Sequence, residues 1–280
     1  MVQIQRLFGT RVIVLMPLAI ALNIVLGSLV GQVLRLPIYL DSIGTILVGA
    51  LAGPIPGLLT GVLTDLLWGY AIPPPVGSPT VGPFSITAGC IGLLAGILGR
   101  FGIFGPWPGR DRRTLLLTAG AVLLVIAITA YTYSRAYASG QAFNSTTGFA
   151  TGAFGASRIA FGIVMLVFAG LAVYGLFIRR DLGAVLALAA GLGIGIVAAI
   201  VSAPIAAYVF GGVTGSGTDL LVAAFRAGGA GLYGAVLQQG LLSDPLDKMI
   251  TCFVVYLVVA GLPRRQLLRF PNGERLAPDG

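Results

Sequence analysis

Two carboxylates in short apolar segments near the N-terminus are the residues best placed to do chemistry in this chain. Asp41 begins the first apolar run, 43–52, and Asp65 lies inside the second, 58–68. The segment 53–57 between them contains two glycines and two prolines. Short helices interrupted by Gly and Pro are typical of transporter binding sites, and a carboxylate at membrane depth needs a partner or a function. We therefore expect residues 36–70 to form the wall of a substrate cavity.

Polar and aromatic side chains near these carboxylates could complete such a cavity. Thr64 and Trp68 are four residues apart and share one helix face, with Asp65 beside it. Trp and Tyr rings offer flat surfaces on which a heterocycle can stack. The predicted substrate-binding residues are Tyr39, Asp41, Thr45, Thr64, Asp65 and Trp68.

The main candidates also have structural alternatives. Asp41 precedes an expected helix and could cap its free N–H groups. Asp65 could form an internal salt bridge with Arg226 or Lys248, and Trp68 could belong to an interfacial aromatic belt. Asp244 and the pair Asp247–Lys248 are expected to give an N-terminal cap and local charge pairing at the last span.

The composition indicates an integral membrane protein. Of 280 residues, 57% are hydrophobic and 9% are charged, whereas a soluble domain has roughly 25% charged residues. The chain has no His, and its two Cys lie in apolar runs, so we predict no metal site. It has no phosphate-binding G-x-x-x-x-G-K-[ST] loop either. We expect neither an enzyme nor a cofactor, and no nucleic-acid binding.

The apolar runs predict an all-α bundle of about eight transmembrane segments that form one domain, residues 1–280. Two of the eight are the short helices of the N-terminal half. The expected segments are 12–34, 41–52, 57–68, 85–98, 114–130, 159–178, 182–210 and 245–262. Segment 71–84 has five prolines and should be a stiff lid or rim, or a plain connector. Segment 136–156 should be an outer loop, and 211–244 a helix that is interfacial or packed inside the bundle.

The distribution of basic residues predicts the orientation. With eight crossings and a cytoplasmic N-terminus, twelve of the 17 basic residues lie inside. The five left outside are Arg35, Arg135, Arg158, Arg226 and Lys248. By the positive-inside rule, both termini of this multi-pass protein of the cell membrane should be cytoplasmic.

Small residues recur along one face of the first span. Ala19, Asn23, Gly27 and Gly31 are spaced by four residues, and such faces let another helix approach closely. The face could pack against the protein's own helices, or it could dock a second membrane subunit.

Several motifs resemble the substrate-binding S components of energy-coupling factor (ECF-type) transporters. They are the stretch 36–45 (LPIYLDSIGT), Gly53-Pro54 with Gly57 and Gly61, the later run 244–248 (DPLDK), and 262–264 (LPR). The similarity is best over residues 1–113 and next best over the last span, within the C-terminal helices 182–263. The family has fewer spans, so 114–178 would be an atypical insertion.

The resemblance implies a fold, a function and partners. An S component binds a vitamin or related micronutrient and docks on a transmembrane scaffold subunit that is driven by two cytosolic ATPases. Ala19, Asn23 and Gly27 would form the docking face, with Asn23 in place of a small residue. The expected function is therefore micronutrient uptake as a membrane substrate-binding subunit. The alternatives are a ligand-sensing membrane domain and a self-sufficient secondary transporter that uses Asp65.

Overall fold

The computed structural model describes residues 8–34, 36–107 and 181–277, with a few isolated positions between 116 and 170. The secondary structure of these residues is entirely helical, as predicted. Three of their helices are long and apolar enough to cross a membrane: Thr10–Val33, Gly82–Arg100 and Leu182–Tyr208. The predicted spans 114–130 and 159–178 and the predicted loop 136–156 lie outside the described residues. A helical membrane protein is supported, whereas a count of eight spans is not.

The N-terminal group contains a long helix followed by the two short ones. Helix α2 (Thr10–Gly27) continues into a π-helical turn η1 (Ser28–Val33), and α3 (Ile43–Ala52) and α4 (Pro54–Leu66) follow, with a second π-helical turn η2 (Leu67–Ala71). Gly53 turns the chain between the short helices with a φ of 103°, which glycine adopts without steric cost. Pro54 then begins α4 at a position where its missing N–H would have no helical partner.

Close backbone approach holds α4 against α5 (Ser85–Arg100), which follows a short 3₁₀ turn η3 (Gly82–Phe84). A Cβ added at Gly57 would collide with the backbone of Gly92, and one added at Gly61 would collide with that of Ala88. Small residues thus form the helix contact here, as in other membrane bundles.

The C-terminal group is built on two long helices that pack together, α8 (Leu182–Tyr208) and α10 (Leu232–Gly261), with the short α9 (Asp219–Ala227) between them in sequence. The predicted helix boundary before Pro245 is wrong, because α10 runs through that proline. Its backbone at Asp244 and Pro245 lies directly against Gly195 of α8. Neighbouring helices make an internal proline tolerable in a membrane bundle.

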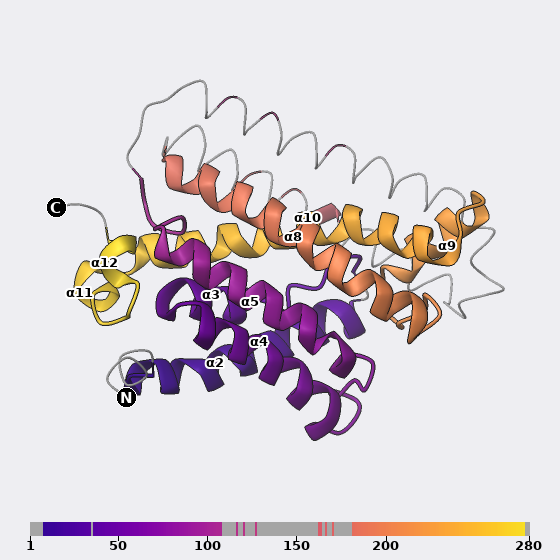
Figure 1. The fold of residues 1–280 in the computed structure, drawn as a ribbon, viewed down its shortest axis with the longest axis horizontal. Helices are drawn as coiled ribbons and strands as arrows, with labels where there is room; N and C mark the ends of the chain where they lie inside the picture. The colour runs from indigo at the N-terminus through magenta and orange to yellow at the C-terminus, as the bar shows by residue number, and fades with distance from the viewer. Residues whose placement is uncertain are drawn as a thin grey trace.

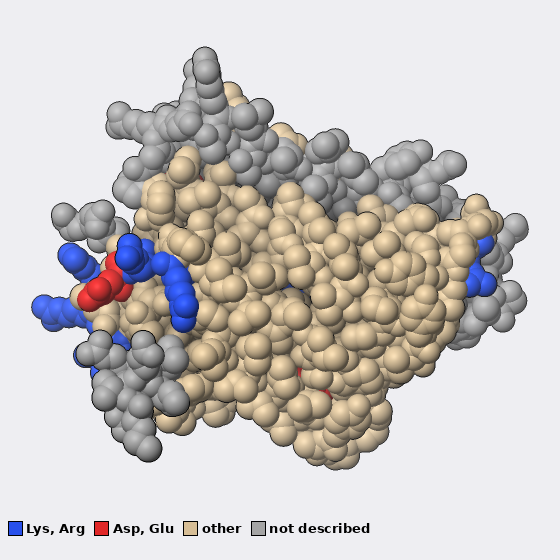
Figure 2. All heavy atoms as spheres, in the orientation of Figure 1, with Lys and Arg blue, Asp and Glu red and all other residues tan. Residues whose placement is uncertain are grey.

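The start of α2 lies at the same end of the bundle as α11 (Arg264–Leu267) and α12 (Gly273–Leu276), while α9 lies at the opposite end (Figure 1). Figure 2 shows basic side chains gathered at the end that carries α11 and α12. Arg264 and Arg265 belong to α11 and Arg275 to α12, whereas Arg226 belongs to α9. This asymmetry fits the positive-inside rule, although the sidedness itself stays a prediction.

The glycine contact between α4 and α5 can be tested by adding one methyl group. Gly57→Ala should lower the free energy of unfolding by roughly 1–3 kcal/mol through overpacking, measured as a lower melting temperature in detergent. Gly193→Ala in α8 is the matched control, because a Cβ there meets no atom within 4 Å. Equal melting temperatures for the two variants would contradict the close approach.

Candidate functional site

A cavity of about 180 Å³ lies between the N-terminal helices and the C-terminal group. Its walls come from α3, α4, α5, α8 and α10, and from the polar segments that precede α5 and α9. The volume is below the roughly 300–1,000 Å³ of pockets for drug-sized ligands. The site therefore suits a small molecule.

The structure brings most of the predicted binding residues together. Those that line the cavity are Tyr39, Asp41, Thr45, Asp65 and Trp68. Thr64 is buried behind the wall, where it donates to the Thr60 carbonyl oxygen. Trp68 is only 4% exposed, so it does not belong to a surface aromatic belt. That these residues bind substrate stays a prediction.

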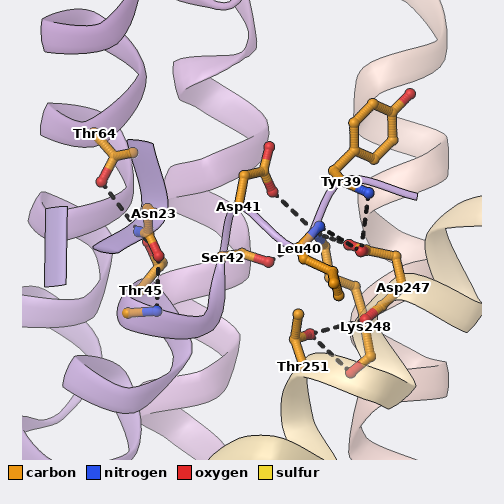
Figure 3. Close-up of polar contacts among 11 residues, drawn as sticks. Asn23, Tyr39, Leu40, Asp41, Ser42, Thr45, Thr64, Asp247, Lys248 and Thr251 are labelled. Carbon is orange, nitrogen blue, oxygen red and sulfur yellow. Dashed lines mark hydrogen bonds and ion pairs between the residues drawn. The ribbon is translucent and has the colours of Figure 1, made fainter. Parts of the chain in front are cut away.

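Asn23 joins three helices and caps one of them (Figure 3). Its side-chain oxygen accepts from the N–H of Gly44 at 2.7 Å, in the first turn of α3. Its amide nitrogen donates to Thr45 at 2.9 Å and to Thr64 at 3.2 Å. A residue of α2 thus satisfies a free N–H group that a local cap would otherwise take. The spacing of residues in the sequence did not indicate that Asn23 caps α3.

The capping role expected for Asp41 is not observed. The residue at the N-cap position of α3 is Ser42, and no side chain of the cap itself bonds the helix. The Asp41 carboxylate instead lies 3.7 Å from the Lys248 ammonium nitrogen. Its role is therefore electrostatic and links α10 to the start of α3.

The predicted docking face points into the protein. Ala19 and Asn23 are 3% and 0% exposed, and Gly27 is buried as well. A side chain at Gly27 would collide with the ring of Trp68, and a Cβ at Gly44 would collide with the backbone of Ala19. The three residues offer no surface to a second subunit in this structure, which favours the alternative of internal packing.

Lys248 organises the polar wall of the cavity. Its ammonium donates to Ser42 at 2.8 Å and to Asp247 at 2.5 Å. The other carboxylate oxygen of Asp247 accepts from the N–H groups of Tyr39 and Leu40, at 3.1 Å and 2.8 Å (Figure 3). Asp247 is completely buried inside α10 and forms the local charge pair with Lys248 that the sequence predicts. The N-terminal cap expected of Asp244 is not formed, because Asp244 also lies inside α10. These bonds fix the segment 39–42 against the C-terminal helix.

Asp65 differs from the other buried acids. It is 6% exposed and lines the cavity. Within the described part of the chain it forms no hydrogen bond and no ion pair, since Lys248 pairs with Asp41 and Asp247. The salt bridge suggested as an alternative, with Lys248 or Arg226, is therefore not formed.

The proline-rich segment 71–84 forms part of the cavity wall. The Val76 carbonyl accepts from the Trp68 indole N–H at 2.7 Å, and the backbone N–H of Ser78 donates to the Trp68 carbonyl at 3.2 Å. Ser78, Thr80 and Val81 line the cavity. The segment is thus more than a connector.

A second loop, 211–218, closes the same cavity and was not predicted as part of the site. Asp219 holds the loop by accepting from the N–H groups of Thr214 and Gly215, at 2.7–3.1 Å. The Tyr39 hydroxyl hydrogen-bonds to Thr218 at 2.8 Å. In the sequence, this part of the cavity wall was indicated by a stretch rich in Gly, Ser and Thr that precedes an apolar helix.

Comparison with protein-family models, curated proteins and solved structures gives no match for this chain.

The charge network around Lys248 predicts a large structural effect. Lys248→Met should leave the buried Asp247 and the partly exposed Asp41 without a cation, and breaking a buried pair such as Lys248–Asp247 costs about 3–5 kcal/mol. We expect a large drop in melting temperature in detergent. Adding Asp41→Asn should recover part of the loss, and a single Lys248→Met variant as stable as wild type would contradict this role.

Proposed function

We propose that this protein is a membrane substrate-binding subunit for uptake of a vitamin or related micronutrient, which works with a separate scaffold subunit and two ATPases, as in an ECF-type transporter. Its place in the cell membrane, with both termini in the cytoplasm, belongs to the same proposal. The resemblance of segments 36–45 and 244–248 to S components suggests the transporter class. The cavity supports small-molecule binding.

The observation that carries the proposal is a small cavity with fixed polar walls and one unpaired buried acid. Binding sites for small molecules combine an apolar lining with a few placed polar groups. Here Ile91 and Phe84 supply apolar surface, and Tyr39, Thr45 and Asp65 supply polar atoms. Asp247 and Asn23 accept hydrogen bonds from backbone N–H groups behind these residues, so much of the site is formed before a ligand arrives.

The unpaired acid also favours a second candidate, a secondary transporter that moves its substrate without ATPases. Intramembrane carboxylates serve as proton or ion sites in such proteins. Transport by the purified protein alone in liposomes, driven by an imposed ion gradient, would establish this second function. The uptake-subunit proposal predicts no transport in that assay.

The proposal is tested first by isolation of the protein from its native membrane. Mass spectrometry of denatured protein should release one small molecule in near-stoichiometric amount, because S components bind tightly. A scaffold membrane protein and ATPases should co-purify under mild detergent. Absence of both the small molecule and the partners would contradict the proposal.

Trp68 gives a variant test of the cavity. Trp68→Ala should reduce the amount of co-purified small molecule at least about tenfold, because an aromatic side chain contributes roughly 1.5–3 kcal/mol when buried. Trp68→Phe should have a milder effect. Phe101→Ala is the control, since Phe101 is 68% exposed and outside the cavity, and it should leave the ligand content unchanged.

A further inference from the structure

The charges around the cavity are unequal. Among the described residues, the lining contains four carboxylates, Asp41, Asp65, Asp219 and Asp244, and one cation, Lys248. Lys248 also offsets Asp247 behind the wall. A single ammonium therefore serves several acids.

Most of these acids have partners within the protein. Asp41 lies beside Lys248 at 3.7 Å. Asp219 accepts N–H and O–H bonds from Thr214, and Asp244 lies four residues before Lys248 in α10. Asp41 and Asp219 thus have partners within the protein.

Asp65 lacks such a partner. It is more than nine-tenths buried, and it forms neither a hydrogen bond nor an ion pair with any described residue. Asp41, another acid, lines the same cavity. A buried carboxylate that stays ionised needs a positive partner.

Other features of the lining indicate what kind of partner fits. Thr87 also lines the cavity, and its buried hydroxyl has no hydrogen-bond partner among the described residues. The Trp68 indole N–H is already bonded to Val76, so the ring is held in place and its π-system is what it can offer. A cation near an aromatic ring is attracted by the ring's quadrupole.

A metal ion fits this site less well. No group of three or more His, Cys, Asp or Glu side chains within the described residues could hold one. A cavity lined by one unpaired carboxylate, one unpaired hydroxyl and an indole ring instead suits an organic cation with a hydrogen-bonding N–H.

We infer that the cavity selects a small organic cation and that Asp65 pairs with its positively charged nitrogen. That nitrogen belongs to an ammonium, an amidinium or a protonated heterocycle, and the adjoining part of the ligand lies against Trp68. This inference rests on the proposed binding function and names the chemical class of its substrate.

The test uses three probes of one shape and different charge: benzamidinium, benzamide and benzoate. Each is titrated into the purified full-length protein, after release of co-purified ligand, by calorimetry at constant ionic strength. We expect benzamidinium to bind at least about tenfold more tightly than benzamide, as a charged hydrogen bond implies, and benzoate to bind weakest. Asp65→Asn should abolish the preference for benzamidinium, and Glu274→Gln, which removes an exposed acid far along the chain, should keep it.

Failure of the cation inference can be distinguished from failure of the proposed binding function. Equal binding of benzamidinium and benzamide, a preference for benzoate, or no binding of any probe would overturn the cation inference. An unchanged preference in Asp65→Asn would overturn the role of Asp65. In each case a neutral or anionic molecule released from the native protein would still support the proposed binding function.

Discussion

The ammonium of Lys248 is the interaction on which the rest of the site depends. A charge buried in a membrane bundle is stable only when it is paired and its remaining hydrogen bonds are satisfied. Lys248 meets this condition by contacting Asp41, Ser42 and Asp247 together. Because Asp247 also holds the backbone of Tyr39 and Leu40, one buried cation ties α10 to the chain that enters α3. Leu40 has a positive φ of 51° there, a conformation that a leucine keeps only when its surroundings impose it.

This network explains why the cavity has a polar wall on one side and an unpaired acid on another. Lys248 is held by Asp41 and Asp247, so it is not free to neutralise Asp65. Asn23 plays the matching role between α2, α3 and α4, since it bonds Gly44, Thr45 and Thr64. The fixed walls leave Asp65 as the acid whose partner must come from outside the described chain. We therefore take Asp65 as the centre of the proposed site.

Local sequence patterns predicted the helices of this fold better than the contacts between them. Apolar runs and the Gly-Pro segment 53–57 were sufficient to predict α3 and α4, because length and turn residues are local properties. The continuous α10 was not predicted, since local sequence does not show that Pro245 lies inside a helix packed closely against Gly195 of α8. The four-residue spacing of small side chains predicted a face of small residues on α2. It could not show whether Asn23 on that face contacts a partner subunit or the protein's own helices.

The central claim is that Asp65 serves a ligand and does not stabilise the fold. Its most direct test is the free energy of unfolding of ligand-free Asp65→Asn beside ligand-free wild type, in the same detergent. Asn keeps the size of the side chain and removes the uncompensated charge, so the variant should be at least as stable as wild type, as is common when a functional group is removed. A variant less stable by about 1 kcal/mol or more, the cost of a lost structural hydrogen bond, would contradict the account.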